Sequence, residues 1–182
     1  MFEFLLPLFS FAIYASITPG PNSIMVAASG ANFGFRRTLP HIAGVAVGLS
    51  LLLLAIGFGM STFVHQFSLL HDLLTALAIF YLLFLAYKMA ITNNKFHKNS
   101  EMKQQAKPLT FVQASIFQWA NPKAWMVSVS AISTFTTVGS HFTAEILVIG
   151  SIFALATAPS IALWVLLGAR IGKILNPSLG KI

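Results

Sequence analysis

The sequence predicts an all-α integral membrane protein with five transmembrane helices. The chain of 182 residues is 57% hydrophobic and only 8% charged, whereas soluble domains carry about 25% charged residues. Apolar runs of about 20 residues recur along the chain, and this is the length of helix that crosses a bilayer. The basic residues gather in the short segments between these runs, which is typical of membrane topology signals rather than of nucleic-acid binding.

The five apolar runs lie near residues 4–29, 40–62, 73–91, 110–137 and 144–168. The second and the fifth are the least interrupted. Residues 92–108 are polar and basic without an apolar period, so they are predicted to form the one long loop. The glycine pairs Gly30/Gly34 and Gly44/Gly48 are expected to permit close helix packing or a tight turn rather than to bind a ligand.

The first and fourth apolar runs are each interrupted by proline. The first run is broken at Thr18, Pro19, Gly20, Pro21 and Asn22. The fourth run is broken at Asn121, Pro122 and Lys123. Proline removes a backbone donor, and in a bilayer the freed backbone groups are tolerated only beside protein or a wet cavity. Paired broken helices in two halves of a membrane protein therefore indicate a transport site.

The basic residues also predict the orientation of the chain. Of the eleven Lys and Arg residues, all except Lys123 fall on one side of the predicted spans. These ten are Arg36, Arg37, Lys88, Lys95, Lys98, Lys103, Lys107, Arg170, Lys173 and Lys181. Because cytoplasmic loops carry the excess of Lys and Arg, we expect a multi-pass protein with its N-terminus outside and its C-terminus in the cytoplasm.

An inverted repeat of the 3+3 type is predicted within a single transmembrane domain. Residues 1–92 form the first three-helix repeat, 93–109 the cytoplasmic basic loop, and 110–182 the second repeat. Three spans are an odd number, so a second copy inserts upside down. The residues after Gly168 are too few and too polar for a sixth span, and the second repeat is therefore expected to be incomplete.

Lys123 is the leading candidate for a functional residue. It stands about 18 Å of helix rise beyond Phe111, too far for its side chain to reach the cytoplasmic edge. A lysine inside a membrane costs roughly 2.5–3.5 kcal/mol and is expected to serve a function. The alternative is a structural pair with a backbone carbonyl freed by Pro122.

Polar residues around the breaks are the other candidates for substrate binding. Asn22 and Asn121 can hold a zwitterion or an unwound backbone, or can merely cap the helices that resume after the prolines. The N-termini of these half-helices would favour a carboxylate. Trp125 and Ser128 continue one face beyond Asn121, as a cavity wall or as helix-helix hydrogen bonds.

Several other functions find no support in the residues. The chain has no cysteine, which excludes disulfides and thiolate chemistry. No metal-ligand spacing, nucleophile motif or phosphate-binding loop occurs, so we expect no metal, no cofactor and no enzyme. No carboxylate lies deep in a predicted span.

The motifs resemble those of the LysE/RhtB amino-acid exporter family over nearly the whole chain. The segments that carry the resemblance are residues 17–22, residues 34–37, Ala43 and Gly44 with Gly48, residues 118–125, and residues 131–135. The pairing of TPGPN with NPKAW makes it specific. Within the family, the chain looks most similar to the branch with small, neutral substrates.

This resemblance implies export of amino acids or their derivatives across the bacterial inner membrane, driven by an ion gradient, with the proton as the candidate ion. The substrate would lie between the broken helices. Members of the family usually have a sixth span. The chain is therefore expected either to function with five spans, for example as a homo-oligomer, or to be an inactive truncated product. A structural membrane subunit that packs with a partner is the alternative outside transport.

Overall fold

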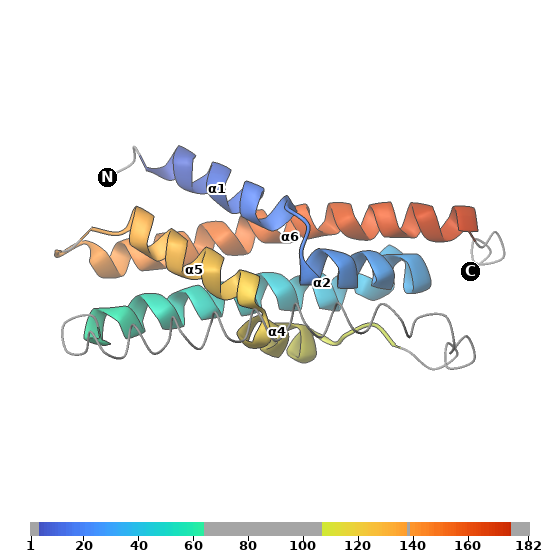
Figure 1. The fold of residues 1–182 in the computed structure, drawn as a ribbon, viewed down its shortest axis with the longest axis horizontal. Coiled ribbons are helices and arrows are strands. Elements are labelled where there is room, and N and C mark those ends of the chain that lie inside the picture. Colours follow the sequence, from blue (N-terminus) through green and yellow to red (C-terminus); the bar gives the residue numbers. More distant parts are fainter. Residues whose placement is uncertain (1–3, 64–106, 138, 176–182) are drawn as a thin grey trace. The chain divides into compact units, whose positions relative to one another are not determined.

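The computed structural model describes residues 4–63, 107–137 and 139–175, which form helices joined by short links (Figure 1). The chain divides into two compact units, one of Met1–Gly59 with Pro108–Ile182 and one of Met60–Lys107. The helices described below belong to the first unit, apart from the last residues of α2. An all-α architecture is confirmed for these residues. The predicted third span, 73–91, and most of the predicted loop, 93–109, lie outside the described residues.

The predicted break in the first apolar run is present. Helix α1 spans Leu5–Ile17, and the chain turns extended at Thr18, with φ −60° and ψ 135°. Helix α2 then begins at Pro21 and continues to Phe63. Proline suits the first position of a helix, because its missing N–H would have no partner inside the helix anyway.

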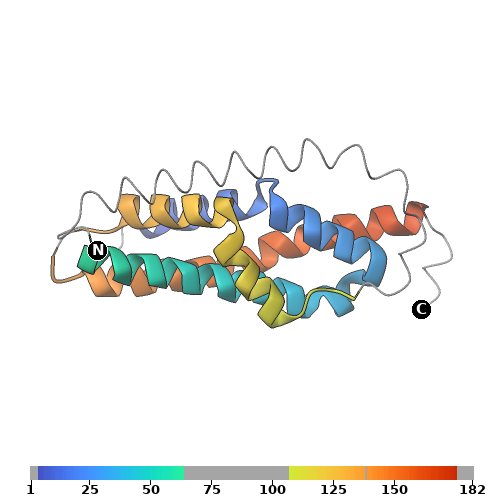
Figure 2. The same ribbon diagram turned by 60° about the horizontal axis from the view of Figure 1, so that its bottom comes forward.

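Gly34 folds helix α2 back on itself. Its φ of 77° and ψ of 173° are not helical, and they divide α2 into a first arm, residues 21–33, and a second arm, residues 35–63. The two arms lie side by side (Figures 1 and 2). The Ser29 and Thr38 hydroxyl groups join the arms with a hydrogen bond of 3.1 Å. The tight turn expected at the Gly30/Gly34 pair is thus located at Gly34.

Replacing Gly34 with alanine is expected to destabilise the protein by about 1–3 kcal/mol, because residues other than glycine rarely adopt this backbone conformation. No atom lies within 4 Å of an added Cβ, so the effect would come from backbone strain alone. Thermal unfolding in detergent measures it. The matched control is Gly59→Ala, which also adds a Cβ in open space but at a glycine without positive φ. Equal melting temperatures for the two variants would contradict the expected backbone strain at Gly34.

The predicted break in the fourth apolar run is also present. Helix α4 spans Phe111–Ala120, and helix α5 spans Pro122–Phe135, with Asn121 between them. The start of α4 is capped reciprocally by Thr110 and Gln113, a pattern that satisfies two free backbone donors. Helix α6 spans Phe142–Leu175 and is longer than the predicted 144–168.

Glycine allows the helices of the first unit to approach closely. A Cβ on Gly30 would overlap the backbone of Val165 in α6, and one on Gly168 would overlap Ala27 in the first arm. Gly44 and Gly48 lie equally close to the backbone of α4. The packing role expected for Gly30, Gly44 and Gly48 is therefore confirmed. Such contacts between small residues bring helices together in bilayers, where burial from water no longer drives association.

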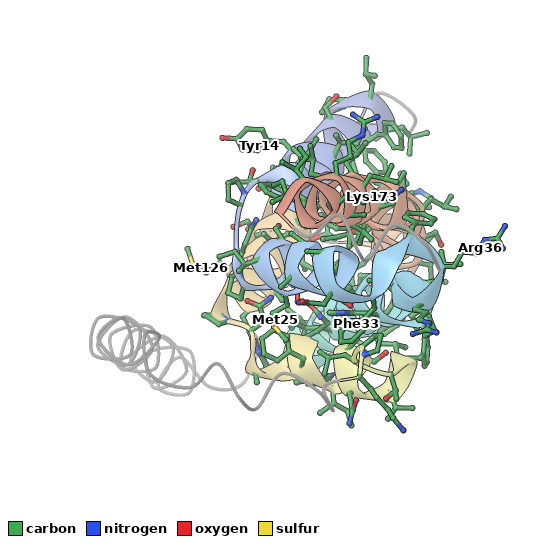
Figure 3. All side chains as sticks on the ribbon, turned by 90° about the vertical axis from the view of Figure 1, so that its right-hand side faces the viewer. Tyr14, Met25, Phe33, Arg36, Met126 and Lys173 are labelled. Atoms are coloured by element: carbon green, nitrogen blue, oxygen red, sulfur yellow. The ribbon has the colours of Figure 1, made fainter. Side chains whose placement is uncertain are left out.

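The outward-facing side chains suit a bilayer. Residues 21–59 and 142–174 form stretches long and apolar enough to cross a membrane, although the first of them reverses at Gly34. Large apolar side chains point away from the helices, with Leu6, Leu155 and Ile174 each about three-quarters exposed. Tyr14 and Met126 also extend outward (Figure 3). Exposed apolar surface of this extent is unusual for a soluble monomer.

The described helices run in opposite directions in the two halves of the chain. In Figure 1, α1 and the first arm of α2 lead from left to right, whereas α4 and α5 lead from right to left. The second arm of α2 and helix α6 are opposed in the same way, and Figure 2 shows the same arrangement.

Candidate functional site

The two helix breaks, about a hundred residues apart in sequence, meet in the structure. The Lys123 ammonium group donates a hydrogen bond to the Thr18 carbonyl oxygen, and its stem lies against Gly20, where a Cβ would stand 2.8 Å from the lysine Cδ. Asn22 and Gln118 pair through their amides: Asn22 donates at 2.7 Å, and Gln118 donates back at 3.3 Å.

Protein groups satisfy the carbonyls freed by the first break. The Tyr14 carbonyl accepts from the backbone N–H and the hydroxyl of Thr18. The Ile17 carbonyl accepts from the Trp164 indole at 3.0 Å. The Thr18 carbonyl accepts from Lys123 and, at 3.4 Å, from the Ser23 hydroxyl. Unwound backbone away from water is stable here because these donors replace water.

At the second break, Asn121 caps helix α5. Its side-chain oxygen accepts from the backbone N–H of Lys123 at 3.1 Å, and the residue is 2% exposed. Asn22 behaves differently, since its side chain reaches across to Gln118 in α4. Of the two interpretations made for the asparagines, capping describes the contact of Asn121. The bond of Asn22 to Gln118 was part of neither interpretation.

A small cavity of about 30 Å³ lies where the breaks meet. A space of this size holds one or two water molecules. Its polar lining consists of Ser16, Asn22, Ser23, Gln118, Asn121, Lys123 and Thr157. Its remaining lining is apolar or glycine: Ala15, Gly20, Val45, Leu49, Ala124, Val127 and Ile161.

The structure brings together four of the predicted site residues in the wall of this cavity: Gly20, Asn22, Asn121 and Lys123. Thr18 adds its carbonyl to the Lys123 contact. Pro21 and Pro122 begin α2 and α5 and so shape the breaks, and Pro19 lies in the link between α1 and α2.

Trp125 lies apart from the cavity lining. Its indole donates to the Trp119 carbonyl at 2.9 Å, and the two rings pack edge to face at 6.4 Å. Gln118, Ser16 and Thr157 were not among the predicted site residues, although all three line the cavity. For Gln118 a signal was present, because an uncharged amide stands inside an apolar run three residues before Asn121.

The electrostatic character of the cavity comes from Lys123. It is the only charged side chain among the described residues that line the cavity, and it extends from the first turn of α5. The N-termini of α2 and α5 add positive partial charge. The arrangement is suited to binding a carboxylate. Within the described parts of the chain, no group of three His, Cys, Asp or Glu residues could hold a metal ion.

Breaking the amide pair is expected to show energetic coupling between the two breaks. Asn22→Ala and Gln118→Ala should each lower the free energy of unfolding by about 1–3 kcal/mol, because each removes the bond between the half-buried Asn22 amide and the buried Gln118 amide. The double variant should lose less than the sum of the two. Thermal unfolding measures this, with Asn32→Ala as the control, since exposed Asn32 bonds to Ala28 of its own helix and not across the breaks. Strict additivity would contradict the coupling.

Comparisons with known proteins show the family of the chain. The family model described as LysE type translocator matches residues 13–181. The cysteine/O-acetylserine efflux proteins of Escherichia coli strain K12 and of Shigella sonnei are each 33% identical to the chain over 127 residues. The aligned part is 69% of this chain and 62% of each relative, so the chain spans less than two thirds of the length of the curated relatives it matches. No solved structure matches significantly.

These matches confirm the resemblance stated from the motifs. The description of the family as translocators agrees with the prediction of a transporter rather than an enzyme. The names of the curated relatives agree with the branch that handles small, neutral substrates.

Proposed function

Because the chain belongs to the LysE type translocator family, we propose that it exports amino acids or small amino-acid derivatives from the cytoplasm across the bacterial inner membrane. The observation that carries this proposal is the meeting of two helix breaks around one cavity that has polar residues in its wall. Broken helices that meet at mid-membrane are the usual construction of a transport site. The names of the curated relatives support the same class of substrate.

In the proposed site, the substrate carboxylate binds Lys123 and the N-terminal ends of α2 and α5, where positive charge is concentrated. The amides of Asn22, Asn121 and Gln118 offer oxygens to the substrate ammonium group. The cavity of about 30 Å³ is smaller than an amino acid. Binding of a whole amino acid therefore requires the breaks to move apart and release the Lys123 contact with Thr18.

The proposed topology follows the distribution of charge. The basic residues Arg36 and Arg37 follow the Gly34 turn, and Arg170 and Lys173 lie in the last turns of α6. The Gly34 turn and the end of α6 lie at the same end of the helices (Figure 1), which supports a cytoplasmic location for this end.

Helix α1 and the first arm of α2 run in the opposite direction to α4 and α5 (Figures 1 and 2). This supports an inverted repeat of residues 1–92 and 110–182 around the loop 93–109. We also propose that the chain crosses the membrane five times and forms a homo-oligomer. Export would be coupled to an ion gradient, with the proton as the candidate ion. Alternating access by such a repeat needs only rocking of one half against the other.

Cells that express this chain are expected to release cysteine, O-acetylserine or another small amino acid several-fold faster than cells with an empty vector. Asn22→Ala and Pro21→Ala should bring efflux close to the vector level, because the first removes an amide of the site and the second alters the break. Immunoblots of the membrane fraction establish equal abundance. Release at the vector level by the original chain, at normal abundance and for all amino acids, would refute export.

A further inference from the structure

A pair of hydroxyl groups in the cavity wall stands apart from the residues assigned above. Ser16, in the last turn of α1, and Thr157, in α6, form a hydrogen bond of 3.0 Å between their hydroxyl oxygens. The side chains are 7% and 1% exposed, and both residues line the cavity. We propose that this Ser16/Thr157 pair binds the polar side-chain group of the substrate and selects small, neutral amino acids that carry one. The inference rests on the proposed export function.

The chemistry of the pair suits this role. Each hydroxyl group carries one hydrogen and two acceptor lone pairs. The bond between them uses one hydrogen, and either oxygen can be its donor. One hydrogen and several lone pairs are left for a ligand in the cavity. The pair can therefore donate to an ester oxygen or exchange hydrogen bonds with a hydroxyl or thiol group.

A second hydroxyl pair in the same protein shows what helix packing alone requires. Ser29 and Thr38 bond at 3.1 Å, are buried as deeply as the first pair, and join the two arms of α2. Thr38 also donates to the Gly34 carbonyl. This pair does not line the described cavity. The Ser16/Thr157 pair differs from it in lining the cavity beside the breaks.

The charges around the cavity exclude cationic side chains. Lys123 is positive, and among the described lining residues none is a carboxylate that could pair with a second cation. Burying an unpaired like charge there would be strongly unfavourable. Val45, Leu49 and Ile161 in the cavity wall are apolar. Among the described lining residues of α1 and α6, the Ser16/Thr157 pair therefore supplies the polar contact. A short, uncharged side chain with one polar group fits this wall.

The decisive experiment compares serine with 2-aminobutyrate, which has nearly the same shape but lacks the hydroxyl group. Cells expressing the full chain are loaded with each amino acid, and the ratio of the two efflux rates is measured. We expect Thr157→Val and Ser16→Ala to lower the serine to 2-aminobutyrate ratio about fivefold to tenfold, the effect of losing one hydrogen bond. Thr38→Val is the matched control and should leave the ratio unchanged.

The possible outcomes separate this inference from the export function. Equal efflux of serine and 2-aminobutyrate by the original chain, or an unchanged ratio in Thr157→Val, would overturn the role of the pair while leaving export intact. Efflux of lysine as fast as that of serine would overturn the exclusion of cations. Absence of all efflux would refute export.

Binding to the purified full chain then tests the Ser16/Thr157 pair alone, by the shift in melting temperature that serine and 2-aminobutyrate each cause. A larger shift with serine that is lost in Thr157→Val would support the role of the pair. Equal shifts for the two ligands with the original chain would overturn it.

Discussion

Replacing Lys123 with methionine is expected to reduce amino-acid export at least about tenfold, because a charge-assisted hydrogen bond contributes about 1.5–3 kcal/mol. Methionine keeps the length and the apolar stem of the side chain but removes its charge. The cavity would then lose the only charged group among its described lining residues, and a substrate carboxylate would be buried without a counter-ion. Initial efflux rates at several internal substrate concentrations measure the effect.

A structural role for Lys123 predicts a different result. Its contact with the Thr18 carbonyl joins the two breaks, so a purely structural lysine would lower the melting temperature and the abundance of the protein. The Ser23 hydroxyl remains near the same carbonyl at 3.4 Å, and we therefore expect Lys123→Met to stay folded. Lys107→Met is the matched control, since exposed Lys107 lies outside the cavity lining. Normal efflux with a lowered melting temperature would restrict Lys123 to a structural role.

Replacing Gly168 with alanine is expected to destabilise the packing of α6 against the first arm of α2. The added Cβ would overlap the backbone carbonyl of Ala27 in the first arm of α2. A backbone atom, unlike the end of a flexible side chain, cannot rotate away from this clash. Helix α6 and the first arm would have to separate, at a cost of about 1–3 kcal/mol for such overpacking. Abundance in the membrane should fall several-fold, together with the melting temperature in detergent.

The control for this prediction is Gly59→Ala, because a Cβ on Gly59 meets no atom within 4 Å. Both changes replace glycine by alanine inside a helix, so helix propensity contributes equally to them. If Gly168→Ala melted at the same temperature as Gly59→Ala, the close approach of α6 to the first arm would be refuted.

The local features of the fold were predictable from the sequence because they depend on neighbouring residues. Prolines at 21 and 122 mark the starts of α2 and α5, since proline tolerates the first position of a helix but not its interior. Gly34 marks the turn within α2, where φ is positive. Long apolar runs indicated the membrane, and the TPGPN and NPKAW motifs indicated the family.

The candidate site was predictable only in part. Asn22, Asn121 and Lys123 were identified as polar residues in apolar surroundings, and they do line one cavity. Under the alternative, structural interpretation, Lys123 would pair with a carbonyl freed by Pro122, yet its bond is to the Thr18 carbonyl of the other break. Trp125 continues the helix after the break, and its indole bonds to Trp119 instead of lining the cavity.

The positions of the helix breaks, the residues too polar for lipid and the family of the chain could be predicted from the sequence, because each depends on local chemistry. Which polar groups meet is known only from the three-dimensional arrangement of the helices. Gln118 pairs with Asn22 across 96 residues, and Ser16 pairs with Thr157 across 141. Such contacts depend on how closely the helix backbones approach, and that approach is set by glycines such as Gly44 and Gly168 acting together.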